Sequence, residues 1–262
     1  MGSREGDLEG LVNPRFWRQR RVAVTGHTGF KGCWLCVWLL ELEAEIHGFA
    51  LAPKTNPALF EQLELASCIN HQLGDVRELG TVQKWLDRAK PDVIFHLAAQ
   101  PIVLCSYKEP LLTWHTNVLG TLNLLEAVRT CGKNCTVVII TTDKVYENRE
   151  RIYAYSEDDR LGGHDPYSSS KAATEMAVAS WRSSFFHLET GIRVATARAG
   201  NVIGGGDWAL DRIVPDLVRA LSDGKPIRVR NPQAMRPWQH VLEPLSGYLQ
   251  LAEKLTTEED FI

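Results

Sequence analysis

Two residues late in the chain have the types and the spacing of a proton-transfer pair. Tyr167 and Lys171 are four residues apart, so on a helix they lie on one face. A lysine ammonium beside a phenol stabilises the phenolate, and we expect it to lower the pKa of Tyr167 from its usual value of about 10. A phenolate can accept a proton from a hydroxyl while a hydride leaves the same carbon for a nicotinamide cofactor.

A glycine-rich segment near the start could hold the phosphates of such a cofactor. Gly26, Gly29 and Gly32 follow the apolar run 21–24 and precede the apolar run 33–40, which predicts a strand, a tight turn and a helix. The N–H groups at a helix start face a pyrophosphate, and glycines let the backbone approach it. The residues predicted to bind the cofactor here are Gly26, Thr28, Gly29, Phe30, Lys31 and Gly32.

Strands and helices alternate along the chain and must position these segments. After the first strand, the pattern predicts strands over 45–50, 71–73, 93–97, 137–140 and 193–197, and helices over 33–40, 81–89, 111–130 and 166–186. Strands that are apolar throughout are typical of a parallel sheet covered on both faces. The fold class is therefore α/β, with a doubly wound parallel sheet that binds its ligands at the carboxyl ends of the strands.

Polar and small residues follow several of these strands and complete the predicted site. The catalytic candidates are Thr142, Asp143, Lys144, Tyr167 and Lys171. The further candidates for contact with the dinucleotide are Asp75, Val76, Ala98, Ala99, Gln100, Asn117, Thr141, Tyr167 and Lys171.

Composition narrows the class of protein. The chain has 262 residues, 44% of them hydrophobic, and a formal net charge of −3, so no basic surface points to nucleic acid. No apolar run reaches the roughly 18 residues of a membrane span, and the first ten residues lack the apolar core of a signal peptide. We expect a cytoplasmic protein.

Of six cysteines, Cys33 and Cys36 form a C-x-x-C within an apolar helix, and we expect free thiols, no disulfide and no metal.

Longer strings around these residues resemble the extended short-chain dehydrogenase/reductase family of nucleotide-sugar enzymes. The resemblance extends from about Phe16 to the end of the chain. It rests on segments 26–32, 95–101, 143–144 with 148–150, 162–168, 198–208 and 236–248. The first of these segments and the Tyr167–Lys171 spacing define only the superfamily. The pairing of Asp143 with Lys144 and the last two strings are narrower.

The resemblance implies bound NAD and a nucleotide-sugar substrate, with CDP-glucose favoured. The implied reaction oxidises C4 of the sugar, removes water across C5 and C6, and returns the hydride to C6. Tyr167 would be the base at the C4 hydroxyl, Lys171 its electrostatic helper, and Thr142 a partner of the C4 oxygen. Asp143 would protonate the departing C6 hydroxyl. Lys144 stands where related dTDP-glucose enzymes have Glu, and would take the C5 proton. The substrate-binding residues implied are Asn201, Arg212, Arg236 and His240.

The resemblance also implies a division of the chain, and the sequence departs from the family at named positions. We expect a disordered leader over 1–15, an NAD-binding domain over 16–200 and, over 201–262, a substrate lobe that is incomplete relative to the family. A homo-oligomer is expected. The stretch 49–54 has no acid to hold the cofactor ribose, which leaves NADP open, and Leu104 stands where the family has Arg. A nucleotide-sugar 4-epimerase or decarboxylase, or a non-catalytic dinucleotide-binding protein, stays open as an alternative.

Overall fold

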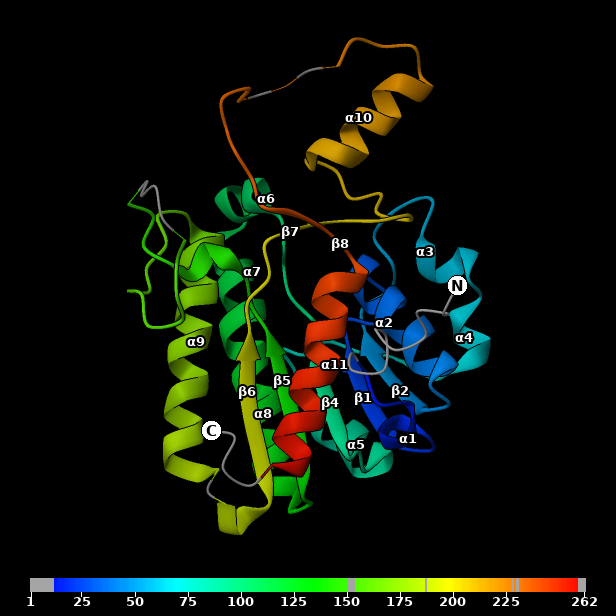
Figure 1. The fold of residues 1–262 in the computed structure, drawn as a ribbon, viewed down its shortest axis with the longest axis vertical. Helices are drawn as coiled ribbons and strands as arrows, with labels where there is room; N and C mark the ends of the chain where they lie inside the picture. Colours follow the sequence, from blue (N-terminus) through cyan, green and yellow to red (C-terminus); the bar gives the residue numbers. More distant parts are fainter. Residues whose placement is uncertain (1–11, 150–153, 187, 228, 230, 259–262) are drawn as a thin grey trace, which may run out of the picture.

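The main sheet has six parallel strands. The computed structural model describes residues 12–149, 154–186, 188–227, 229 and 231–258. The strands are β1 (Arg21–Thr25), β2 (Glu45–Ala50), β3 (Asn70–Leu73), β4 (Val93–His96), β5 (Cys135–Ile140) and β6 (Ile192–Ala197). Their order in the sheet is β3-β2-β1-β4-β5-β6, which confirms the doubly wound fold (Figure 1). The order reverses between β1 and β4, where such sheets bind ligands.

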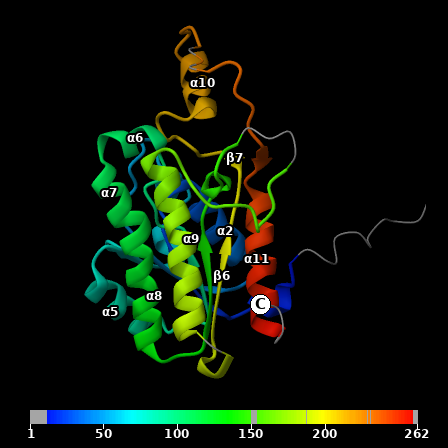
Figure 2. The same cartoon turned by 90° about the vertical axis from the view of Figure 1, so that its left-hand side faces the viewer.

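Helices cover both faces of this sheet, because the central strands are apolar on both sides (Figures 1 and 2). One face packs against α2 (Phe30–Glu41) and α11 (Leu242–Thr257). The other packs against α5 (Leu79–Ala89), α8 (Gly120–Cys131) and α9 (Pro166–Phe185). Every residue of β4 and of β5 is buried. The short helices are α1 (Pro14–Trp17), α3 (Leu59–Gln62), α4 (Leu65–Cys68), α6 (Val103–Lys108), η2 (Asp143–Val145) and η3 (Leu188–Thr190).

The helix predicted over 111–130 has an irregular middle. It begins as α7 (Pro110–Trp114), passes through the π-helical turn η1 (His115–Leu119) and continues as α8. A π turn widens the helix by one residue, and such turns occur frequently at functional sites. Here the turn contains Asn117, whose side chain is fully buried.

The chain from residue 201 leaves the main sheet and then returns to it. β7 (Asn201–Ile203) pairs with β8 (Trp238–His240), and α10 (Ile213–Ser222) lies above the carboxyl ends of the main strands (Figure 1). However, α11 packs against β5 and β6. We therefore limit the proposed substrate lobe, predicted over 201–262, to residues 201–241. Helix α11 belongs with the main sheet.

The predicted leader needs a correction at its end. Residues 1–11 lie outside the described part of the chain. Residues 12–15 do not belong to a disordered segment, because α1 begins at Pro14 and the backbone N–H of Asn13 donates to Glu253 Oε1 at 2.9 Å. Trp17 Nε1 donates to the same oxygen at 2.6 Å. Among the described residues, no helix combines the length and the apolar character that crossing a bilayer requires.

Candidate active site

The three glycines of the turn between β1 and α2 differ in how much room a side chain would have at each position. Gly26 has a φ of +75°, and a Cβ there would lie 2.7 Å from the backbone N of Ala98. A Cβ on Gly32 would lie 2.2 Å from the Gly26 carbonyl oxygen. Gly29 is different, because its Cβ would meet only that same oxygen, at 3.4 Å.

The helix start beside this turn is open to a ligand. Gly29 is the N-cap of α2, and no side chain caps the helix. The first N–H groups of a helix need an acceptor, and the helix dipole favours an anion there. The close turn and the uncapped helix fit the pyrophosphate of a dinucleotide. Thr28 does not cap the helix, because its hydroxyl donates to the Leu51 carbonyl at 2.8 Å and fixes the loop after β2.

Two of the predicted cofactor residues, Gln100 and Asn117, hold other parts of the site in place. Asn117 Oδ1 accepts from the backbone N of Gln100 at 2.8 Å, and its Nδ2 donates to Ser170 Oγ at 2.9 Å. Gln100 Nε2 donates to Thr113 Oγ1 at 2.8 Å. Both side chains are buried. The π turn therefore ties the loop after β4 to α9.

Asp75, predicted to contact the dinucleotide, already has a partner in the loop after β3. Arg77 Nε donates to Asp75 Oδ2 at 2.9 Å. This hydrogen bond lowers the pKa of Asp75. Val76 is buried, and a Cβ on Gly120 would lie 2.8 Å from its side chain. Asp75 and Val76 thus have local structural partners, and their contact with the dinucleotide stays a prediction.

Tyr167 and Lys171 lie on one buried face of α9, as their spacing predicts. Asp165 caps this helix by accepting from the backbone N–H groups of Tyr167 and Ser168, both at 3.0 Å. Lys171 Nζ donates to the Ile140 carbonyl at 3.0 Å. Burial, assisted by the charge of Lys31, lowers the pKa of Lys171 to about 7.

The expected fall in the pKa of Tyr167 is wrong for this structure. Burial raises the pKa of Tyr167 to about 12, against the opposing effects of a hydrogen bond with Thr142 and the charge of Arg212. A phenol that is 8% exposed loses the water that would stabilise its anion. Lys171, whose ammonium donates to the Ile140 carbonyl and is itself disfavoured by burial, does not prevent this rise in the pKa of Tyr167.

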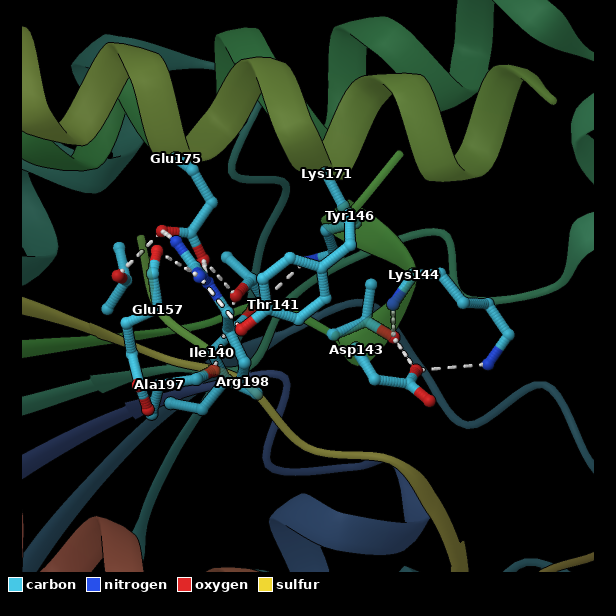
Figure 3. A network of polar contacts seen from close by, with 12 residues as sticks. Ile140, Thr141, Asp143, Lys144, Tyr146, Glu157, Lys171, Glu175, Ala197 and Arg198 are labelled. Atoms are coloured by element: carbon cyan, nitrogen blue, oxygen red, sulfur yellow. Dashed lines mark hydrogen bonds and ion pairs between the residues drawn. The ribbon is translucent and has the colours of Figure 1, made fainter. Parts of the chain in front are cut away.

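Asp143 and Lys144 lie beside each other just after β5. Thr142 Oγ1 donates to Asp143 Oδ1 at 3.0 Å, and Lys144 Nζ lies 3.2 Å from the same oxygen (Figure 3). Lys144 Nζ also donates to Asn201 Oδ1 at 3.3 Å. Each side chain of the ion pair is about a third exposed. An acid and an amine therefore share one hydrogen bond next to the residue that contacts Tyr167.

A cavity of about 1140 Å³ lies between these residues and the segment that contains α10. On the side of the main sheet it is lined by Thr141, Thr142, Lys144 and Tyr167, with Phe30 and Lys31 from the start of α2. Burial, together with the charge of Arg212, lowers the pKa of Lys31 to about 8. Leu104, predicted to replace an arginine, also lines the cavity.

Three of the four predicted substrate residues also line the cavity, namely Asn201, Arg212 and Arg236. Arg212 Nη1 is held by Asp207 Oδ2 at 2.8 Å. His240 is not among the lining residues. Its Nδ1 accepts from the Leu242 backbone N at 3.4 Å, and its ring packs edge-on against Trp34. β8 thus directs the His240 ring toward Trp34 on α2, and a role for His240 in substrate binding stays a prediction.

The C-x-x-C pair has no role in this site. Cys33 and Cys36 are buried in α2, and burial raises the pKa of both thiols, to about 12 for Cys33. All six cysteines are free thiols, and buried thiols such as those of Cys33 and Cys36 are unreactive.

Prediction from the sequence missed a buried ion pair below the cavity, between Glu175 on α9 and Arg198 after β6. The spacing held one signal for it, since Glu175 follows Lys171 by four residues and so shares its helix face. No sequence pattern indicates that Arg198 is its partner.

Comparisons with known proteins agree with this geometry. The profile of the GDP-mannose 4,6 dehydratase family matches residues 23–262. The chain is 47% identical over 252 residues to the CDP-glucose 4,6-dehydratase of Salmonella typhimurium, covering 95% of this chain and 70% of that protein. It is 28% identical over 216 residues to the CDP-paratose 2-epimerase of Salmonella typhi, covering 72% of this chain and 59% of that one.

A solved structure extends the likeness to the fold and its ligand. The crystal structure of DesIV, a dTDP-glucose 4,6-dehydratase from Streptomyces venezuelae with NAD bound, superimposes with a TM-score of 0.76 at 25% identity. The match covers 90% of this chain and 72% of that one.

Proposed function

The chain belongs to the GDP-mannose 4,6-dehydratase family, and we propose that within it the chain is an NAD-dependent CDP-glucose 4,6-dehydratase. The product is CDP-4-keto-6-deoxyglucose. One observation carries the proposal: Tyr167, Thr142 and Lys144 line the same cavity, and Asp143 is hydrogen-bonded to both Thr142 and Lys144. Oxidation at C4 needs only Tyr167. Loss of water also needs an acid for the C6 oxygen and a base for the C5 proton.

The NAD site is built by the glycine turn and by the loops after β3, β4 and β5. The uncapped start of α2 would hold the pyrophosphate, and the loop fixed by Gln100 and Asn117 would contact the nicotinamide end. A nicotinamide held there would supply the hydride transfer from C4 and back to C6. We keep the residues named for the cofactor as part of this proposal, with NAD rather than NADP as the ligand.

Oxidation is assigned to Tyr167, Lys171 and Thr142. The phenol oxygen of Tyr167 takes the proton of the C4 hydroxyl, and Thr142 hydrogen-bonds the same sugar oxygen. A phenol with a pKa of about 12 is a weak acid, so its anion needs a nearby positive charge. Lys171 supplies that charge when it is protonated, and its pKa of about 7 allows both states near neutral pH.

Loss of water is assigned to Asp143 and Lys144. Moving one proton along their 3.2 Å contact converts the ion pair into a neutral amine and a carboxylic acid without changing the total charge. In that form Lys144 takes the C5 proton, which the C4 ketone has made acidic, and Asp143 gives its proton to the departing C6 oxygen. Both residues then carry their original charges, so the elimination restores the ion pair.

The substrate's diphosphate is assigned to Arg212 and Arg236, which both line the cavity. A guanidinium donates to two oxygens in a fixed fork, which suits a phosphate. Asn201 lies beside the catalytic pair, because its Oδ1 accepts from Lys144 Nζ at 3.3 Å, and it is assigned to the sugar.

Incubation with CDP-, UDP-, GDP- and dTDP-glucose in the presence of NAD tests the function. We expect a product one water lighter than the substrate, seen by mass spectrometry, with CDP-glucose preferred. Asp143→Asn should keep C4 oxidation and slow water loss. Lys144→Ala should slow exchange of the C5 hydrogen with deuterated solvent.

Two surface variants serve as controls for those substitutions. Asp158→Asn and Lys84→Ala change exposed residues outside the cavity and should leave both rates unchanged. If Asp143→Asn and Lys144→Ala both dehydrate CDP-glucose at the parent rate, the dehydratase assignment fails. A parent that produces only a C4 epimer supports the epimerase alternative instead. A parent that binds NAD but turns over no substrate supports the non-catalytic one.

We further propose that the chain forms a homo-oligomer and acts in the cytoplasm. Large apolar side chains are exposed on the neighbouring helices α6, α7 and α9, among them Tyr107, Leu111, Trp114 and Met176. An apolar face of this kind is typical of a subunit contact. Sedimentation should show a species larger than one chain, and a monomer at all concentrations would contradict the proposal.

A further inference from the structure

A buried ion pair lies below the cavity and bridges two elements of the fold. Arg198 donates to Glu175 through Nε, at 3.1 Å from Oε1, and through Nη2, at 3.2 Å from Oε2 (Figure 3). The side chain of Glu175 is 5% exposed and that of Arg198 is 18% exposed. Two parallel bonds between planar groups fix both distance and orientation. The pair therefore connects α9 rigidly to the end of β6.

Glu175 also binds the first residue after β5. Thr141 Oγ1 donates to Glu175 Oε1, and Thr196 Oγ1 donates to Oε2 at 2.7 Å. The backbone N–H of Thr141 donates to the Ala197 carbonyl at 2.9 Å. Thr141 directly precedes Thr142, which contacts Tyr167. Glu175 is thus in a position to fix where Thr142 lies relative to the phenol.

The third nitrogen of Arg198, Nη1, contacts the other end of the segment that begins at Thr141. Nη1 donates to the hydroxyl of Tyr146 at 3.0 Å and to the Glu157 carbonyl at 3.1 Å. The Tyr146 ring stacks on Tyr155, with ring centroids 4.9 Å apart. Tyr146 directly follows the turn η2, which contains Asp143 and Lys144. One ion pair therefore holds segment 141–146 at both of its ends.

We propose that Glu175 and Arg198 are positioning residues that align the dehydration residues with the oxidation residues. The inference rests on the function proposed above. The Thr141 end sets the geometry of Thr142 and Tyr167, which serve oxidation at C4. The Tyr146 end sets the geometry of Asp143 and Lys144, which serve elimination. Because the Glu175–Arg198 ion pair binds both ends of segment 141–146, it fixes the oxidation residues relative to the elimination residues.

Two isosteric substitutions separate the two ends. Tyr146→Phe removes the hydroxyl that Arg198 holds and keeps the stacked ring. We expect water loss and C5 exchange to fall on the order of tenfold, since small misplacements of reacting groups are costly, while C4 oxidation stays within about twofold. Thr141→Val should do the reverse, slowing oxidation while leaving unchanged the fraction of oxidised sugar that loses water. Oxidation is followed by the absorbance of transient NADH, and C5 exchange by mass in deuterated solvent.

A third variant and a control test whether the pair itself matters. Arg198→Lys keeps the positive charge but cannot form the fork, so both stages should slow. Asp92→Asn weakens another ion pair, in which Asp92 accepts from Lys133 Nζ at 3.0 Å near the amino ends of the strands. It should leave the balance between oxidation and water loss unchanged. Equal slowing of both stages in Tyr146→Phe would overturn the positioning role.

Hydrogen exchange without substrate tests the positioning role independently of turnover. Backbone amides of segment 141–146 should exchange faster in Arg198→Lys and Tyr146→Phe than in the parent, but not in Asp92→Asn. Unchanged exchange in the first two variants refutes the positioning role even if the parent is an active dehydratase. A parent without product refutes the proposed function alone, because the exchange result still decides whether the ion pair orders this segment.

Discussion

Replacing Lys171 by Met should stabilise the fold in a way that depends on pH. Lys171 is 4% exposed, and its Nζ donates to the Ile140 carbonyl. Burial and the charge of Lys31 lower its pKa from 10.5 to about 7, although the carboxylate of Glu175 opposes this. His96, fully buried below the site, has its own pKa lowered to about 3 by burial and by Lys171. Protonation of Lys171 therefore lowers the stability of the folded protein, because the ammonium is buried.

The sign follows from the number of protons bound by each state. Between pH 7 and 10.5 the unfolded chain holds a proton on Lys171 that the folded protein does not hold, so stability increases with pH. This contribution is present above pH 10.5 and is lost as the pH falls through 7. At about 1.4 kcal/mol per pH unit, the whole window corresponds to on the order of 5 kcal/mol. Lys171→Met removes this dependence and adds only a constant cost for the lost hydrogen bond.

Urea unfolding of the parent and of Lys171→Met at several pH values measures the effect. We expect the variant's free energy of unfolding, relative to the parent, to rise by several kcal/mol as the pH falls from 10 to 7. Lys84→Met, at an exposed position of α5, is the matched control and should give a difference that does not vary with pH. Parallel pH profiles for the parent and Lys171→Met would refute the reasoning that burial depresses this lysine.

Two further predictions concern the cofactor and the oxidation step. Gly29→Val should fold as the parent does, because a Cβ there has room, yet it should lose NAD binding measured by titration calorimetry. Gly32→Ala should instead lower the melting temperature, because its Cβ would lie 2.2 Å from a carbonyl oxygen. Unimpaired NAD binding by Gly29→Val would remove the glycine turn from the site. Tyr167→Phe should still bind CDP-glucose but lower transient NADH formation by roughly 10²–10⁴-fold, the usual range for a lost general base. Near-normal turnover in that variant would exclude Tyr167 from the mechanism.

The elements of the sheet could be predicted because their signals are local. Apolar runs marked β4 and β5, and both are buried at every position. The spacing of Tyr167 and Lys171 correctly placed both residues on one face of α9, since helix geometry alone decides it. The π turn at 115–119 was missed, because apolar residues there keep a nearly helical spacing while the hydrogen-bond pattern changes.

The sequence by itself determined the doubly wound sheet, the glycine turn and the residues gathered at the carboxyl ends of the strands, because each depends on neighbours within a few positions. Only the tertiary structure decided the charge states and partners. Glu175 meets Arg198 from 23 residues away, and Arg198 meets Tyr146 from 52 residues away. The burial that lowers the pKa of Lys171 and raises that of Tyr167 is a property of packing between distant segments. Water removed by that packing, rather than residue type or spacing, sets the electrostatics of the site.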